Sequence, residues 1–302
     1  MANQDNTRSP GTVPRFYVWG REILYLGTEA SQPAPHRVAH DKLMVSLDGD
    51  FWINTGEGFV RSRSCLMTTG QWHDRKTVDT SGAVTATWLL PSFSQDVPSL
   101  TRIMDRAGPD LYYDHPQENQ LIGALMVAGS TVGIVGDVDV DRTRQHLRQW
   151  LLPSEFEARV FRVFDPRVLE VVRRVRQTAN LNLPIGHYAS EVGLSSSYLE
   201  KLFKAQTGLP ITQFRLRYRT YVSAILLGMG YSITEAALKA GFSSSSHFSR
   251  THRALTGETA SSLFIRSGAQ SIIERRVLKS VLQLVRGSTA RGSRGSQVDT
   301  SE

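Results

Sequence analysis

Residues 189–208, ASEVGLSSSYLEKLFKAQTG, and residues 237–257, ALKAGFSSSSHFSRTHRALTG, decide the fold of the C-terminal half of this chain. Both stretches run through a small residue, a glycine, an apolar residue, a serine cluster, a second apolar residue, basic residues and a closing Thr-Gly. The turn glycines, Gly193 and Gly241, lie 48 residues apart. A short pattern that recurs at this distance indicates two copies of one supersecondary unit.

Each copy has the layout of a helix-turn-helix. The glycine supplies the backbone angles of the turn, and the apolar residue after it fills the core beneath the turn. The next serine, Ser195 in the first copy and Ser243 or Ser244 in the second, can accept hydrogen bonds from the free amides that begin a second helix. We therefore predict two units, over residues 186–207 and 234–257, whose second helices are candidate recognition helices.

The candidate recognition helices have polar outer faces. At about 100° per residue, Leu199, Leu202 and Phe203 cluster on the inner side of the first helix. The residues on the outer sides are Ser197, Glu200, Lys201 and Lys204 in the first copy and Ser246, Ser249, Arg250 and Arg253 in the second. Any solvated surface helix has a polar face, but two complete copies favour helices that enter the major groove of DNA.

A helical connector is expected between the two units. Pro210 begins a helix over residues 211–227, which spans about 27 Å. A rod of that length would hold the recognition helices about one DNA turn apart, near the ~34 Å that separates successive major grooves on one face. Arg215, Arg217 and Arg219 lie on or beside this rod, and for each of them both a phosphate contact and an internal salt bridge remain open.

Charge supports a nucleic-acid partner for the second half. The chain has 302 residues and a formal net charge of +7. Residues 1–150 hold 14 Lys or Arg against 17 Asp or Glu, and the remainder holds 21 against 11. An anionic membrane surface would demand the same imbalance. No apolar run approaches the roughly 20 residues of a bilayer span, and the polar N-terminus has no signal-peptide core, so we expect a cytoplasmic protein without a membrane partner.

The N-terminal half has a strand-like pattern. Residues 1–15 are polar and predict a flexible arm, whereas residues 16–95 contain short aromatic and β-branched runs separated by turn signals. Asp48-Gly49-Asp50 between KLMVSL and FWIN is a hairpin signal. A small antiparallel barrel or sandwich follows from this spacing. Cys65, the only cysteine, excludes an internal disulfide and lies in an apolar run typical of a buried thiol.

Helical periodicity returns after the barrel. Residues 96–164 predict accessory helices that pack on the barrel or pair with a second subunit, followed by a linker. Asp165-Pro166 begins a new helical domain over 165–267, an extra amphipathic helix is expected over 268–286, and a disordered tail over 287–302. The fold class is thus α+β: an N-terminal antiparallel barrel with accessory helices and an all-α C-terminal domain with two helix-turn-helix units.

From about Val168 to Arg266 the chain resembles the AraC/XylS family of bacterial transcriptional regulators. The motifs that carry the resemblance are GLSSSYLEKLFKAQTG, the connector ending in AILL, SITEAALKAGFSSSSHFSR and LTGETASSLFIR. The resemblance implies base-reading roles for Ser197, Glu200, Lys201, Ser245, Ser246 and Arg250. Phosphate contacts are expected at Lys204, Ser249, Arg253 and Arg217. His252 and Ala260 depart from the family's usual aromatic residue and proline.

The N-terminal half is similar to the cupin-like sensor domains of part of this family. PHRVAHDKLMVSLDGDFWIN followed by CLMTTGQWH follows the cupin order of an early histidine pair and a later Gly-x-x-His. In metal cupins the corresponding histidines, here His36, His40 and His73, would bind a divalent ion. Their spacing departs from that pattern, so we expect no metal and place them, with Trp52, as candidates for an effector pocket.

These observations predict a sequence-specific regulator of transcription, by the family resemblance an activator, and not an enzyme. Its partners would be promoter DNA, RNA polymerase and a small-molecule effector bound in the barrel, with no cofactor. The resemblance also implies a homodimer formed through the N-terminal half. Two alternatives remain: a metal-dependent cupin enzyme fused to a DNA-binding domain, and a ligand-independent DNA-binding repressor.

Overall fold

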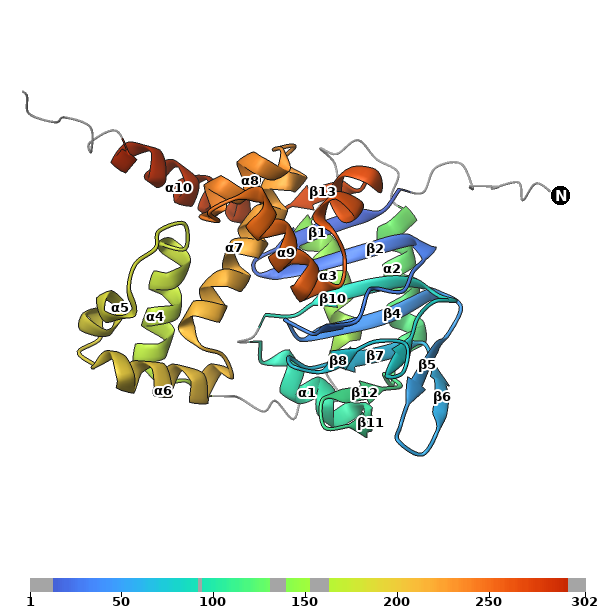
Figure 1. Ribbon diagram of the computed structural model, residues 1–302. Coiled ribbons are helices and arrows are strands. Elements are labelled where there is room, and N and C mark those ends of the chain that lie inside the picture. Colours follow the sequence, from blue (N-terminus) through green and yellow to red (C-terminus); the bar gives the residue numbers. More distant parts are fainter. Residues whose placement is uncertain (1–12, 92–93, 131–139, 153–162, 293–302) are drawn as a thin grey trace, which may run out of the picture.

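The computed structural model describes residues 13–91, 94–130, 140–152 and 163–292, the last six of these by backbone only, and consists of a sheet-rich N-terminal domain and a helical C-terminal domain (Figure 1). The α+β class predicted from the sequence is confirmed. Within the described residues no helix is long and apolar enough to cross a bilayer.

An eight-stranded sheet forms the centre of the N-terminal domain. Its strands, in spatial order, are β11 (Asp105–Gly108), β12 (Leu111–Tyr113), β7 (Ser64–Met67), β4 (Lys42–Asp48), β10 (Val84–Leu89), β2 (Glu22–Ala30), β1 (Arg15–Trp19) and β13 (Gln270–Ile273). Smaller sheets are formed by β3 (His36–Arg37) with β8 (Trp72–His73), and by β6 (Phe59–Ser62), β5 (Phe51–Asn54) and β9 (Val78–Asp79). Every pair is antiparallel except β1 and β13.

The turn at residues 48–50 does not close the hairpin that the sequence suggested. It passes the chain from β4 in the large sheet to β5 in a small one. Gly49 has a φ of +85°, which a glycine adopts without strain, and the Ser46 hydroxyl donates to its carbonyl oxygen at 2.7 Å. The turn was therefore located correctly, but the partners of its two strands lie elsewhere.

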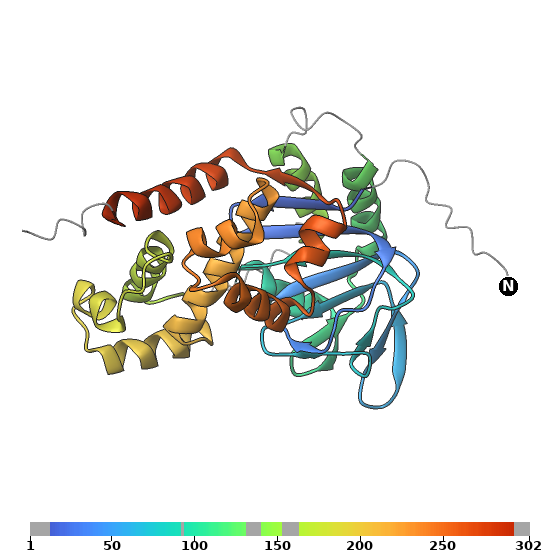
Figure 2. The same cartoon turned by 45° about the horizontal axis from the view of Figure 1, so that its top comes forward.

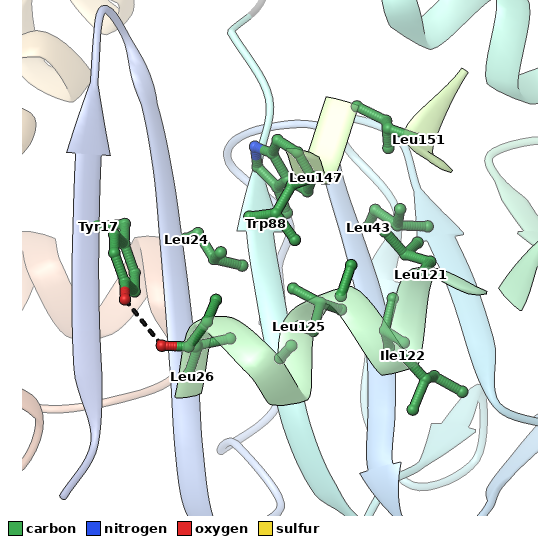
Figure 3. Close-up of a cluster of buried hydrophobic side chains, with 14 of the residues drawn as sticks. Tyr17, Leu24, Leu26, Leu43, Trp88, Leu121, Ile122, Leu125, Leu147 and Leu151 are labelled. Atoms are coloured by element: carbon green, nitrogen blue, oxygen red, sulfur yellow. Dashed lines mark hydrogen bonds between the residues drawn. The ribbon is translucent and has the colours of Figure 1, made fainter. Parts of the chain in front are cut away.

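Helices α1 (Asp96–Ile103), α2 (Glu118–Ser130) and α3 (Val140–Leu151) belong to the N-terminal domain. Leucines of α2 and α3 pack on Leu24, Leu43 and Trp88 of the sheet (Figure 3). Glu22 is buried beside this core, where it accepts hydrogen bonds from the indole N–H groups of Trp19 and Trp88, both at 3.0 Å. Arg144 and Arg148 of α3 pair with the same carboxylate, so a buried charge is compensated and α3 is fixed to the sheet.

The C-terminal domain contains the predicted helices. They are α4 (Pro166–Gln177), α5 (Ile185–Glu191), α6 (Ser196–Thr207), α7 (Ile211–Gly228), α8 (Ile233–Ala240), α9 (Ser245–Thr256) and the π-helical segment η2 (Ser261–Arg266). Asp165, Ser195 and Ser244 cap α4, α6 and α9 through their side chains, as the sequence indicated. Gly208 and Gly257 end the two recognition helices in the left-handed conformation.

The segment after residue 268 differs from the prediction of a single amphipathic helix. Residues 270–273 form β13, which pairs in parallel with β1, and α10 (Arg275–Gly292) follows. Ile272 enters the core of the N-terminal domain and Ile273 packs with the second helix-turn-helix unit, as expected for alternate residues of a strand. Helix α10 extends past the predicted helix end at residue 286.

The two domains make extensive contact. Helices α2 and α3 cover one face of the large sheet, while α9 and η2 lie over the other (Figures 1 and 2). The ring of Phe16 in β1 stacks on Phe264 of η2 with centroids 4.5 Å apart. The Tyr221 hydroxyl of α7 donates to Gly20 O at 2.8 Å. Most of the predicted arm and the end of the predicted tail, residues 1–12 and 293–302, lie outside the described residues.

Candidate nucleic-acid interface and ligand pocket

The two recognition helices present the expected faces to solvent. In α6, Leu199 and Phe203 are buried, whereas Ser197, Glu200, Lys201 and Lys204 are exposed. In α9, Phe248 and His252 are buried, Ser245 is half-buried, and Ser246, Ser249, Arg250 and Arg253 are exposed. Two polar, partly basic helix faces supported by apolar inner faces suit insertion into major grooves.

Each recognition helix rests on its own core. In the first unit, the rings of Phe203 and Phe214 meet at 5.6 Å. In the second, Phe248 contacts Phe242 and His252, at 5.3 and 5.6 Å. His252 Nδ1 donates to Glu258 O at 2.9 Å, and burial lowers the pKa of this histidine. The histidine that departs from the family pattern therefore serves as a neutral core residue.

The arginines of the connector α7 contact backbone carbonyl groups. Arg219 Nε donates to Ala179 O at 2.5 Å, and Arg215 Nη1 donates to Leu183 O at 2.6 Å, so both fix the α4–α5 loop. Arg217 Nη1 donates to Ala39 O of the N-terminal domain. In this conformation Arg217 is engaged between the domains, and its expected phosphate contact stays a prediction.

A cavity of about 1110 Å³ lies between the sheet and the second helix-turn-helix unit. One wall is the sheet face that carries Phe16, Tyr25 and Met44. The opposite wall is residues 255–267 of the DNA-binding domain, including Leu263. The pocket is thus lined by both domains, whereas the sequence predicted an effector pocket inside the barrel alone. Contacts between distant segments leave no local sequence pattern, so the second wall could not be predicted.

Lys42 and the histidines form the polar end of this pocket. Lys42 is buried in the pocket wall and its Nζ lies 3.0 Å from His73 Nδ1. Burial lowers the pKa of Lys42 to about 8. Burial, and after it the positive charge of Lys42, lowers the pKa of His36 to about 4 and that of His73 to about 2. His36 and His40 line the pocket, and His73 lies behind Lys42.

The histidines do not fit a cation site. The Lys42 ammonium occupies the Nδ1 side of His73, and the charge of Lys42 opposes protonation of both His36 and His73. The described part of the chain holds no group of three or more His, Cys, Asp or Glu side chains that could bind a metal. Cys65 is buried, and its pKa is raised to about 12 by burial.

Trp52 lies outside the pocket. It sits on β5 with 47 % of its surface exposed, and the guanidinium of Arg61 lies 5.8 Å from its ring centroid. By contrast, sequence reasoning did not select Lys42, a residue whose position in a strand of mixed polarity gave no sign of its burial.

The class of the C-terminal domain follows from its family match. Residues 188–266 match the family model described as a helix-turn-helix domain. Together with the paired units and the connector, this match defines an AraC-type DNA-binding domain in the C-terminal part of the chain.

Individual relatives extend this comparison. The HTH-type transcriptional regulator RipA of Corynebacterium diphtheriae is 33% identical over 118 residues, which cover 36% of this chain and 35% of RipA, so the chain matches about a third of that relative's length. The structure of an apo ToxT variant from Vibrio cholerae strain SCE256, with a single lysine replaced by alanine, matches with a TM-score of 0.54 at 15% identity, over 82% of this chain and 99% of ToxT.

A second ToxT structure, of the wild-type protein from the same strain bound to an unsaturated fatty acid, gives a TM-score of 0.51 at 13% identity over 81% of this chain and 95% of that one. At these identities the likeness shows a shared two-domain fold.

Proposed function

We propose that this protein is a transcriptional regulator whose DNA binding responds to a small molecule in the pocket between its domains. The observation that carries the proposal is the wall formed by residues 255–267, because these residues continue directly from recognition helix α9. A ligand in the pocket would contact the sheet and the DNA-binding domain at once. It would therefore favour one position of the second recognition helix relative to the N-terminal domain.

DNA would be read by two recognition helices. Base contacts are assigned to Ser197, Glu200, Lys201, Ser245, Ser246 and Arg250, and phosphate contacts to Lys204, Ser249 and Arg253. Phosphate neutralisation would supply most of the affinity and make it fall with salt, while the base contacts would supply sequence preference. Selection of bound duplexes from a random pool tests this role, since a single enriched motif is expected. Recovery without enrichment would contradict it.

The ligand we infer is an amphipathic molecule with an apolar part and one anionic group. Apolar side chains, among them Phe16, Met44 and Leu263, form about half of the pocket lining, and Lys42 places a buried ammonium within it. A buried charge needs a partner of opposite sign, and a carboxylate would supply it. Two ToxT complexes support this class, since one contains an unsaturated fatty acid and the other a naphthalenyl-butenoic acid.

Oleate and oleyl alcohol can test this ligand class, because they differ in the anionic group. Lys42→Met should weaken oleate binding at least tenfold in calorimetry and leave binding of the alcohol unchanged. Lys76→Met, at an exposed position, is the matched control and should bind both as the parent does. Equal affinity for acid and alcohol in the parent protein would contradict the role of Lys42.

The remaining elements of the proposal come from the family resemblance. They are activation of transcription, contact with RNA polymerase, location in the cytoplasm and a homodimer formed through the N-terminal half. Met126 and Val127 of α2 are exposed apolar residues on that half and suit such an interface. Unchanged promoter binding across a screen of apolar acids would instead favour the ligand-independent repressor.

A further inference from the structure

Lys42 lies on the pocket side of the large sheet. Successive residues of β4 face opposite sides, so Leu43 packs with the leucines of α2 and α3 (Figure 3), whereas Lys42 and Met44 line the pocket. The residues opposite Lys42 on the neighbouring strands are both apolar, Leu89 of β10 and Met67 of β7. Only 6 % of the surface of Lys42 is exposed. An amine shielded from bulk water thus borders a cavity of about 1110 Å³.

The amine of Lys42 is held by a neutral hydrogen-bond acceptor. Its Nζ lies 3.0 Å from Nδ1 of His73, and burial with the charge of Lys42 lowers the pKa of that histidine to about 2. The ring is therefore neutral, and its Nδ1 can accept one N–H of the lysine. Burial lowers the pKa of Lys42 itself to about 8, so the ammonium and the neutral amine are both populated near pH 8.

We propose that Lys42 is a covalent attachment point for apolar aldehydes, which it captures as an imine. A neutral lysine amine in a desolvated site attacks carbonyl carbon. The lone pair of Nζ forms the new bond to the carbonyl carbon, both amine protons pass to the carbonyl oxygen, and that oxygen leaves as water while the C=N bond forms. The step releases one water molecule and consumes no oxidant or reductant.

The surroundings of Lys42 favour this product. A buried ammonium is costly to keep out of water, and an imine at the same nitrogen can be neutral. An aldehyde carries no charge into the pocket, and its alkyl chain would lie against side chains such as Phe16, Met44 and Leu263. The inference rests on the cavity proposed above as a ligand site, but it requires neither an acidic ligand nor the reading of DNA.

Oleyl aldehyde with sodium cyanoborohydride tests the proposal on the full-length protein, because the reductant converts an imine into a stable secondary amine. Intact-mass spectrometry should show one addition, with the mass of the aldehyde less its oxygen atom. Peptide mapping should place it on Lys42. Lys76 and Lys279 are exposed and serve as references within the same molecule, and we expect Lys42 to be labelled at least tenfold faster than either.

Lys42→Arg is the decisive variant, because it keeps the charge at this position and cannot form an imine under these conditions. It should lose the fast addition, whereas Lys76→Met, the matched control at an exposed lysine, should keep it. Urea unfolding checks that both variants fold. The proposal is overturned if Lys42 of the parent protein is labelled no faster than Lys76 and Lys279, or if Lys42→Arg retains the fast addition.

Calorimetry with oleate keeps this proposal distinct from that of an acidic ligand. A parent protein that binds oleate but is not labelled at Lys42 would reject the imine alone. A parent protein that is labelled at Lys42 but does not bind oleate would support the imine and reject the acidic ligand.

Discussion

Gly257, the residue that ends recognition helix α9, lies in direct contact with Ala34 of the N-terminal domain. The Ala34 amide donates to Gly257 O at 3.1 Å, and a Cβ built on Gly257 would lie only 2.6 Å from Ala34 O. Gly208 ends α6 with the same backbone angles, φ +75° against +74°, but a Cβ there would meet nothing within 4 Å. The two recognition helices therefore end with the same backbone geometry, but only α9 ends in contact with the N-terminal domain.

Alanine substitution at these two glycines distinguishes the stability cost at the domain contact from the cost at the left-handed helix end. Gly208→Ala should cost about 1–2 kcal/mol for the left-handed backbone. Gly257→Ala should cost that amount and roughly 1–3 kcal/mol more, because the methyl group has no room at the domain contact. Urea unfolding of the full chain measures both. Equal losses in the two variants would mean that the contact between Gly257 and Ala34 does not constrain the protein in solution.

Arg250→Ala should reduce affinity for the selected duplex by about 1–3 kcal/mol and relax the preference at one base step. Lys204→Ala is the comparison, since loss of a phosphate contact should weaken binding to all duplexes alike and lower the salt slope by about one. Fluorescence anisotropy on the selected and random duplexes at several salt concentrations distinguishes them. If Arg250→Ala weakened both duplexes equally, its base-reading role would be rejected.

Acid should destabilise the contact between the domains. The pKa values of His36 and His40, about 4 each, lie below the ordinary 6.5 because burial disfavours the charged ring. Stability is therefore fully present above pH 6.5 and is lost as pH falls towards 4, by at most about 1.4 kcal/mol per pH unit for each histidine. The charges of Lys42 and Arg217 that face these rings act in the same direction.

Urea unfolding between pH 7.5 and 4.5 measures this dependence. His36→Gln should flatten the pH profile, whereas His146→Gln, on the exposed side of α3, should leave it as in the parent protein. A profile that is identical in all three proteins would show that the buried state of His36 does not govern acid sensitivity.

The strand β13 should contribute measurably to stability. Ile272 is buried in the core of the N-terminal domain, so Ile272→Ala should cost about 2–4 kcal/mol. Ile265→Ala removes the same atoms from a side chain that is 56 % exposed and should change stability by less than about 0.5 kcal/mol. Thermal unfolding followed by circular dichroism compares them, and similar Tm values for both variants would contradict the docking of β13.

Local signals account for what the sequence predicted well. The caps at Asp165, Ser195 and Ser244 and the left-handed glycines act on neighbours within one helical turn, so they can be recognised from adjacent residues. The connector α7 likewise matches its predicted length. Helical spacing within each copy likewise predicted which residues of α6 and α9 are exposed.

Long-range contacts account for the differences. Ile272 and Ile273 fit a helical spacing with later residues, but pairing with β1 selects a strand, and β1 lies at the other end of the sequence. The pocket wall at 255–267 likewise faces sheet residues with which it shares no local sequence pattern. Burial of Lys42, the decisive property of that residue, depends on the packed fold and could not be read from its neighbours.

The position of β13 has a consequence for biosynthesis. Strand β1 leaves the ribosome well before its outer neighbour β13, which ends directly before Glu274. The Glu274 carboxylate accepts from the amide of Gly20, 254 residues earlier. Until β13 follows, the backbone groups along one margin of the nascent sheet lack their final partner. Closure of the sheet thus waits until β13 has been synthesised, and termination before that point would release chains that expose this margin to one another.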